Sequence, residues 1–368
     1  SLLNMILYFN DLSEETTIKY IEKMNEKIQF PKIGEKRPLS KEILKLINDL
    51  VKDSHFFMIK KGDISSVSLR EINRFAIIFN FFFDEYFWYK NMTLKKEDLE
   101  RKSLVLSLYI CYFMRLPTTD LRNKYLEEII NKNIPTKDFL DICHEERLYI
   151  TKYILEGQKI KNGYAKNRGL CENLFSEFIC ILLREPLIIC GKPGSSKSLS
   201  VRLLLNVMKG EKSNVNFFKK FPEVFPLFYQ CSLTSTSENL EKVFEKAKEK
   251  VKKNEYKKIV LIIMDEMGIA DDSVNNPLKV LHSKLDDISW ESNDNKKNKI
   301  ALICLSNWTL DASKMNRAIN EAHEEPDSSY IEETARGIVK GINCNLDEKS
   351  DNIIKAISNA YLYYYNEE

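Results

Sequence analysis

The sequence is poor in histidine and has no closely spaced cysteine pair. Its 368 residues include eight cysteines without a single CxxC pair, and four histidines at positions 55, 144, 282 and 323. Cys143 and His144 are the only adjacent Cys/His pair, and no nearby ligand completes a metal set. Structural zinc sites need paired ligands at short spacings, so we expect no zinc centre here. Free, buried thiols in a reducing, cytoplasmic compartment are the expected alternative to disulfides.

The sequence also lacks an apolar run long enough for a membrane-spanning helix. Its longest apolar stretches are FAIIFNFFFDEYFWY (residues 75–89), which contains two acids, and LVLSLYICYFM (residues 104–114). Both are shorter than the roughly 20 residues that cross a bilayer, so we expect buried core helices. The opening SLLNMILYF has no basic segment before it, which favours a fragment edge over a signal peptide.

Neither sign of charge is in large excess. The chain has 56 Lys and Arg against 54 Asp and Glu, a net charge of +2. Nucleic-acid-binding proteins usually carry a basic patch or stripe, and this sequence has none, so we expect no nucleic-acid partner. The length is sufficient for two or three compact units.

The two halves of the chain show different periodicities. Up to about residue 155 the spacing predicts only helices, at 14–28, 41–52, 69–89, 99–115, 120–131 and 137–155. After residue 163, short apolar strands alternate with helices. The predicted strands are 186–191, 227–232, 259–266 and 299–307, and the predicted helices are 167–183, 197–208, 237–251, 277–287, 329–341 and 349–364. This alternation predicts an α/β fold with a parallel sheet, preceded by an all-helical region.

Residues 191–198, GKPGSSKS, differ at one position from a phosphate-binding loop. Such a loop needs inward-pointing backbone N–H groups, a lysine for the β- and γ-phosphates and a hydroxyl for magnesium. Ser196 stands where the usual pattern has glycine. The alternative is a serine-rich helix N-cap with an incidental lysine. The expected nucleotide-binding residues are Gly191, Lys192, Pro193, Gly194, Ser195, Ser196, Lys197, Ser198 and Leu199.

Polar residues end two further predicted strands. Asp265 and Glu266 follow the apolar run IVLIIM, and Asn307 follows IALICLS. In phosphoryl-transfer enzymes an aspartate at this place holds magnesium, here together with Ser198, and a neighbouring glutamate activates water. An amide such as that of Asn307 can reach the water or the γ-phosphate. Each residue alone could be an ordinary strand-end turn. Together they form a set at the carboxyl ends of parallel strands, where ligands bind.

The sequence resembles the AAA+ ATPase core of the mysterin family, giant dynein-like AAA+ ubiquitin ligases. The resemblance covers about residues 163–340 and is carried by GYAKNRGLCENLF, PLIICGKPGSSKSL, FYQCSLTST, MDEMGIADDSVNNPLKVLH, LSNWTLDASKMNR and ETARGI. The family has the same serine at the position of Ser196. The resemblance implies an AAA+ large domain at 163–325 and the start of its helical lid at 326–368. It also implies a lid of a preceding unit at 1–116 and a helical linker at 117–162.

The resemblance also implies roles for two arginines. The segment SVSLREINRFAIIFNFF (residues 66–82) resembles the lid of a preceding unit, in which Arg70 would face a nucleotide bound elsewhere. Arg317 lies where AAA+ proteins often place a catalytic arginine toward a neighbouring unit. The family tends to have a second arginine at the position of His323, and the acids Glu321, Glu324 and Glu325 could instead hold Arg317 in a structural ion pair.

Two functions of different class follow from these patterns. The first is an ATPase in which ATP and Mg²⁺ bind at 191–199 and the nucleotide cycle moves neighbouring AAA+ units of a longer chain. Glu266, Asn307 and Arg317 are then its catalytic residues. The second is a module in which ATP only binds and holds lid and core together. Ubiquitin machinery would be reached through other domains, because no RING-type zinc module occurs in these residues.

Overall fold

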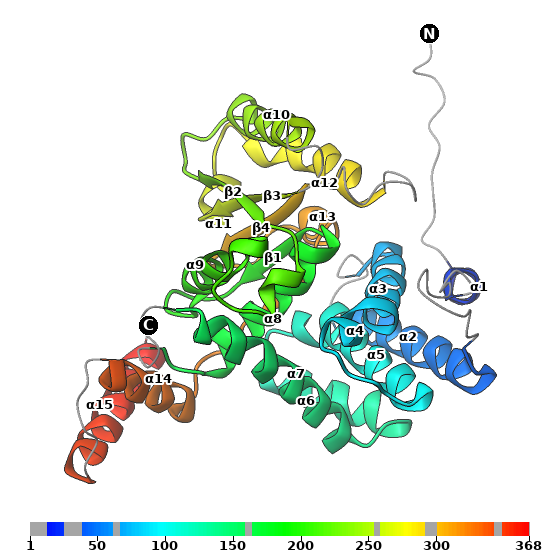
Figure 1. Ribbon diagram of the computed structural model, residues 1–368, viewed down its shortest axis with the longest axis horizontal. Coiled ribbons are helices and arrows are strands. Elements are labelled where there is room, and N and C mark those ends of the chain that lie inside the picture. Colours follow the sequence, from blue (N-terminus) through cyan, green and yellow to red (C-terminus); the bar gives the residue numbers. More distant parts are fainter. Residues whose placement is uncertain are drawn as a thin grey trace.

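A computed structural model describes residues 13–25, 39–61, 67–158, 164–253, 258–290, 300–341 and 348–367 (Figure 1). A helical region occupies one side of the molecule, a sheet with its covering helices lies beside it, and two C-terminal helices extend at one end (Figure 1). No described helix is both long and apolar enough to cross a membrane. Seven cysteines are described, and all seven are free and buried, as predicted.

The first part of the chain is helical throughout its described residues, as the periodicity predicted. Its elements are α1 (Glu14–Asn25), α2 (Lys41–Lys61), α3 (Leu69–Phe81), η3 (Phe82–Tyr86), α4 (Phe87–Tyr89), α5 (Lys96–Cys111), η4 (Phe113–Arg115), α6 (Thr119–Glu128), η5 (Ile130–Lys132) and α7 (Thr136–Glu156). The predicted end of the first helix, residues 26–28, lies outside the described residues. The predicted helix at 69–89 contains a π-helical turn at η3.

Five parallel strands form one sheet, in the order β2-β3-β4-β1-β5. They are β1 (Leu187–Cys190), β2 (Val224–Gln230), β3 (Ile259–Asp265), β4 (Ala301–Ser306) and β5 (Ile319–Ala322). Four of them were predicted, and β5 was not. Because β5 adds to β1 at the edge of the sheet, the missed strand makes β1 an interior strand.

Alternate residues of the strands belong to two separate cores. Leu187, Ile189, Ile263 and Ile303 pack with α8 (Arg168–Leu183), α9 (Lys197–Val207) and the helical region. Ile188, Ile262 and their neighbours pack with helices of the opposite face. These helices are α10 (Ser237–Lys253), α11 (Met267–Asp271) and α12 (Val280–Trp290), with the short η8 (Pro277–Lys279) before the last. Since both faces are covered, the inner strands β1, β3 and β4 are almost continuously apolar rather than alternating.

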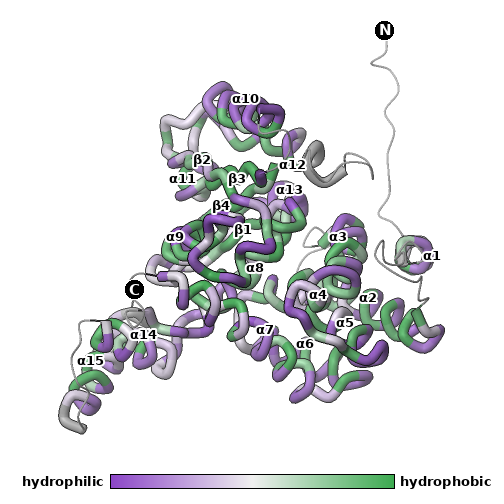
Figure 2. The backbone as a smooth tube through the Cα atoms, viewed as in Figure 1, coloured by the Kyte–Doolittle hydropathy of each residue, from purple (hydrophilic) through white to green (hydrophobic). Residues whose placement is uncertain are grey.

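Helix α10 illustrates how a charged segment becomes a covering helix. Leu240, Phe244, Ala247 and Val251 recur every three or four residues and are all buried. The remainder of the helix is rich in Lys and Glu, and Figure 2 shows it largely in the hydrophilic colour. The apolar stripe therefore faces the sheet while the charged face meets solvent.

The helical region is joined to the sheet by buried charged groups. Glu71 accepts hydrogen bonds from Arg74 and Arg115, each at 3.0 Å. Arg74 also donates to the backbone oxygens of Asn316 and Ala318, each at 3.2 Å. Glu71 belongs to a capping box with Ser68, which starts α3 here. Glu71 of this capping box therefore also positions Arg74 and Arg115, and Arg74 holds the turn before β5.

The chain ends in two helices that resemble a small separate lobe. α14 (Ser328–Gly341) and α15 (Glu348–Glu367) pack against each other and lie at the end of the molecule away from α2 (Figure 1). Ile338, Ile353, Ile357 and Tyr361 are all more than half exposed. The helices predicted at 329–341 and 349–364 are confirmed.

Candidate functional site

The strand order brings three strand ends together. β4 lies between β1 and β3, and all three run in the same direction. The loop 191–196 follows β1, Asp265 and Glu266 end β3, and Asn307 follows β4. The predicted nucleotide-binding and acidic residues therefore share the carboxyl edge of one sheet, where open α/β sheets bind ligands.

The 191–196 loop turns through two residues with left-handed backbones. Gly194 has φ +89° and Ser196 has φ +62°. Gly191 has no room for a side chain, because a Cβ there would come within 2.9 Å of the His323 ring and within 2.8 Å of Ser195 Oγ. Ser196 precedes α9, yet its side chain makes no capping hydrogen bond. The simple N-cap interpretation of these serines is therefore wrong.

Lys197 begins α9 and folds back over the loop. Its ammonium donates to the backbone oxygen of Gly191, to that of Lys192 at 3.2 Å and to Ser195 Oγ at 3.1 Å. Burial lowers the pKa of Lys197, while the nearby carboxylates of Glu266 and Asp265 oppose this shift. A cation held among loop carbonyls at a helix N-terminus is suited to an anionic ligand.

The acidic side of the site is connected to the loop through Ser198. Ser198 Oγ donates to Asp265 Oδ2 at 3.2 Å, so a hydroxyl and a carboxylate adjoin each other. Hard oxygen donors of this kind suit Mg²⁺. Glu266 has a left-handed backbone, φ +56°, and its carboxylate accepts from Asn307 Nδ2 at 3.1 Å. The structure thus brings Lys197, Ser198, Asp265, Glu266 and Asn307 into one cluster.

The other predicted residues divide between two edges of the sheet. Lys192, in the loop, pairs with Glu325 at 3.0 Å. Arg317 precedes β5 and therefore lies at the amino edge, opposite the loop, where it donates to the backbone oxygen of Ser313. Arg70 lies one helical turn before Arg74 on α3, close to the same edge. The two arginines are not brought to the 191–198 loop.

The acids suggested as partners for Arg317 have other partners. Glu321 is fully buried and bonded to Ser176. Glu324 pairs with Arg122 at 3.5 Å and with Arg168, and Glu325 pairs with Lys192. The reason is the direction of β5, which carries Glu324 and Glu325 to the carboxyl edge while Arg317 stays at the amino edge.

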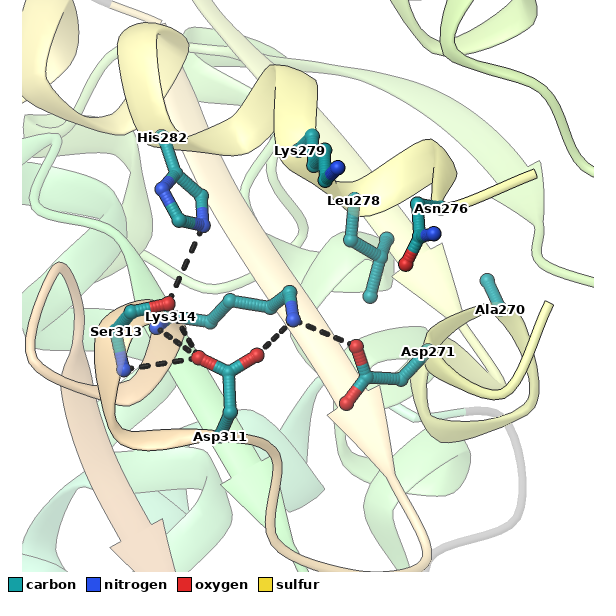
Figure 3. Close-up of a pocket in the computed structure, with 9 residues that line it drawn as sticks. All are labelled: Ala270, Asp271, Asn276, Leu278, Lys279, His282, Asp311, Ser313 and Lys314. Carbon is teal, nitrogen blue, oxygen red and sulfur yellow. Dashed lines mark hydrogen bonds and ion pairs between the residues drawn. The ribbon is translucent and has the colours of Figure 1, made fainter. Parts of the chain in front are cut away.

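A polar cavity of about 260 Å³ lies between α11, α12 and α13 (Ala312–Met315) (Figure 3). Lys314 Nζ reaches across it to Asp271 at 2.7 Å and also pairs with Asp311. His282 and Ser313 meet at 3.3 Å at its other side. These pairs connect the segment after Glu266 with the segment after Asn307. We interpret the cavity as the contact region between these two segments.

Two residues beside the loop were not predicted as part of the site. Asn173 on α8 donates through Nδ2 to the Ser195 backbone oxygen at 3.0 Å. Its Oδ1 lies 2.6 Å from His323 Nε2, and His323 packs against Gly191. Burial is the main cause that lowers the pKa of His323, to about 4. The sequence distinguishes His323 only as a departure from an arginine, and no motif indicates Asn173.

The chain is similar to several known proteins. A family model described as "RNF213 AAA domain" matches residues 163–330. The chain is 32% identical over 352 residues to "E3 ubiquitin-protein ligase rnf213-beta" of Danio rerio, and 29% identical over 354 residues to "E3 ubiquitin-protein ligase RNF213" of Homo sapiens. Each match covers 92% of this chain but only 7% of the relative. A solved structure titled "Structure of Rhizobiales Trip13" shares 14% identity, with TM-score 0.34, over 57% of this chain and 71% of that one.

Proposed function

Because this chain contains an AAA+ core of the RNF213, or mysterin, family, we propose that it binds ATP with Mg²⁺ at residues 191–199 and hydrolyses it. The chain spans 7% of the length of these relatives, so the site would act as one unit among others. The observation that carries the proposal is the cluster of Lys197, Ser198, Asp265, Glu266 and Asn307 at one sheet edge.

Each residue of the cluster has a distinct task in this proposal. The loop amides and Lys197 bind the β- and γ-phosphates. Ser198 and Asp265 would hold Mg²⁺, which neutralises phosphate charge when bound. Glu266 takes the proton from the attacking water, and Asn307, already bonded to Glu266 at 3.1 Å, keeps that carboxylate oriented.

The supporting argument for hydrolysis over binding alone is the Asn307–Glu266 pair. A module that only holds ATP needs the loop and the lysine but no oriented base. We further propose that turnover moves neighbouring AAA+ units of the same chain, in the cytoplasm, and that any ubiquitin-ligase activity belongs to other parts of the full protein.

The test compares two variants of the full-length protein. Lys197→Ala should reduce the number of ATP molecules bound per chain by one, since it removes the phosphate-binding cation. Glu266→Gln should keep the bound number and lower ATP turnover to that of Lys197→Ala, because the amide cannot accept the proton. Bound nucleotide is counted by equilibrium dialysis, and turnover by phosphate release.

The outcomes separate the two functions. An unchanged bound number in Lys197→Ala would refute nucleotide binding at this loop. If Lys197→Ala loses one bound ATP while both variants keep the parent's turnover, the site binds ATP without hydrolysing it.

A further inference from the structure

We propose that Asn173 and His323 are positioning residues that hold the phosphate loop in its binding conformation. The proposal rests on ATP binding at residues 191–199. His323 donates to Asn173, Asn173 donates to the Ser195 backbone oxygen, and the chain of bonds fixes the peptide between Ser195 and Ser196.

The direction of each hydrogen bond follows from the chemistry of the groups. A backbone oxygen can only accept, so the Asn173 atom 3.0 Å from the Ser195 oxygen must be its NH₂ group. The amide oxygen of Asn173 then faces His323 Nε2 at 2.6 Å, and Nε2 must carry a proton. One tautomer of a neutral His323 satisfies both bonds.

The geometry of the peptide bond connects this relay to phosphate binding. A trans peptide is planar, and its C=O and N–H point in opposite directions. With the Ser195 carbonyl held toward Asn173, the N–H of Ser196 points away from α8. Ser196 directly precedes Lys197, where phosphate loops present their backbone donors. Asn173 therefore fixes the aim of a loop amide without touching the ligand.

His323 is itself held in place from both sides. Its backbone N–H donates to the Cys190 oxygen at 2.9 Å, which extends the pairing of β5 with β1. Its ring packs against Gly191. On its other flank, Arg122 of α6 donates to the Ala322 oxygen at 2.9 Å and pairs with Glu324 at 3.5 Å. The helical region thereby anchors the residue that supports the loop.

The proposed chain of hydrogen bonds gives a reason for the burial of two polar side chains, those of Asn173 and His323. Asn173 is fully buried on α8, which also buries the polar residues Glu172, Ser176 and Glu177. The side chain of His323 is only 6% exposed. Burying polar groups is unfavourable unless they are bonded, and here the two side chains bond each other and the loop, with Glu321 Oε1 a further 3.7 Å neighbour of His323 Nε2.

The experiment measures ATP affinity at this site in the full-length protein. A fluorescent, non-hydrolysable ATP analogue is titrated, and the signal that remains in Lys197→Ala is subtracted as the contribution of other sites. Asn173→Ala and His323→Leu should weaken the site about tenfold, the effect of losing one hydrogen bond of roughly 1.4 kcal/mol. His323→Gln should restore near-parent affinity, because its amide can donate from about the position of Nε2.

A second buried histidine provides the matched control. His55 on α2 is 3% exposed and takes no part in the loop's hydrogen bonds, so His55→Leu should leave ATP affinity unchanged, whatever its effect on the melting temperature. Affinities are measured well below every variant's melting temperature. Parent-like affinity in Asn173→Ala and His323→Leu, or equal weakening in His323→Leu and His323→Gln, would overturn the relay. If Lys197→Ala itself removes no binding signal, the proposed function fails instead.

Discussion

At the scale of single residues, Ser196 combines an unfavourable backbone with a place in the proposed phosphate-binding loop. Its φ of +62° and ψ of +14° are left-handed, a conformation that costs a residue with a Cβ roughly 1–2 kcal/mol. Glycine, the usual residue of phosphate loops at this position, avoids that cost. The loop keeps this conformation with a serine because Lys197 and Asn173 both hydrogen-bond to the neighbouring Ser195.

The first residue-scale prediction is that Ser196→Gly stabilises the protein. The relief of left-handed strain is partly offset by the greater freedom of glycine in the unfolded chain, about 0.5–1 kcal/mol. We expect a net gain of about 0.5 kcal/mol, measured as a higher midpoint of urea unfolding.

Ser195→Gly is the matched control in the same loop. Ser195 does not have a positive φ, and its hydroxyl bonds the Lys192 oxygen and Lys197. This variant should lower the midpoint. A loss of stability in Ser196→Gly as large as in Ser195→Gly would show that the left-handed turn is not strained.

The sequence predicted the residues at the carboxyl edge because each ends an apolar run. Asp265, Glu266 and Asn307 follow runs long enough to identify buried strands, and Lys197 follows a glycine turn. Asn173 could not be found in this way. It lies within α8 and belongs to no motif, and its partners, Ser195 and His323, are 22 and 150 residues away in sequence.

At the scale of elements, β5 shows why one strand escaped prediction. Its residues Ile319, Asn320, Glu321 and Ala322 are all buried, yet two of them are polar. Asn320 donates to the Met315 oxygen at 2.9 Å, and Glu321 bonds Ser176. A strand whose polar side chains are satisfied by tertiary partners has neither an apolar run nor an alternating pattern, so periodicity cannot identify it.

Glu321 is expected to be neutral in the folded protein. Burial, with a smaller effect of the nearby Glu172 charge, raises the pKa of Glu321 to about 8. The Ser176 hydroxyl has one proton but two partners, the Asn173 backbone oxygen and Glu321. A protonated Glu321 resolves this competition, because it can itself donate to Ser176.

The element-scale prediction concerns the pH dependence of stability. Between pH 4.5 and 8 the folded state holds a proton on Glu321 that the unfolded chain has lost, so stability should fall as pH rises through this range. Glu321→Gln keeps the bond to Ser176 without titrating. It should be more stable than the parent by on the order of 4 kcal/mol at pH 8 and about equal to it near pH 4.5.

Chemical denaturation of both proteins at a series of pH values measures this difference. Glu325→Gln, at a largely exposed glutamate of the same segment, is the control and should follow the parent at every pH. A constant difference between Glu321→Gln and the parent across the series would mean that Glu321 does not titrate in this range.

At the scale of the whole molecule, α3 of the helical region contacts the amino edge of the sheet. Arg74 holds the backbone on both sides of Arg317, and Arg70 lies one turn away on the same helix. Both Arg70 and Arg317 are at the edge opposite the 191–198 loop. α3 and this edge of the sheet thus each carry an arginine, an arrangement suited to a nucleotide that another unit binds. The resemblance to the family implied this role for each arginine separately.

The last prediction is that Arg317 serves a neighbouring unit rather than its own. In the full-length protein with its own site silenced by Lys197→Ala, adding Arg317→Ala should lower the remaining ATP turnover further. An arginine directed at the phosphates contributes about 10³–10⁵ in rate at the site it serves. The melting temperature should change little, because Arg317 is partly exposed and its bond to the Ser313 oxygen is local.

Lys246→Ala, on the solvent side of α10, removes the same charge and should leave turnover unchanged. Unchanged turnover together with a markedly lower melting temperature in Arg317→Ala would assign this arginine a structural role, since a group that only braces the turn before β5 affects folding and not a neighbour's chemistry.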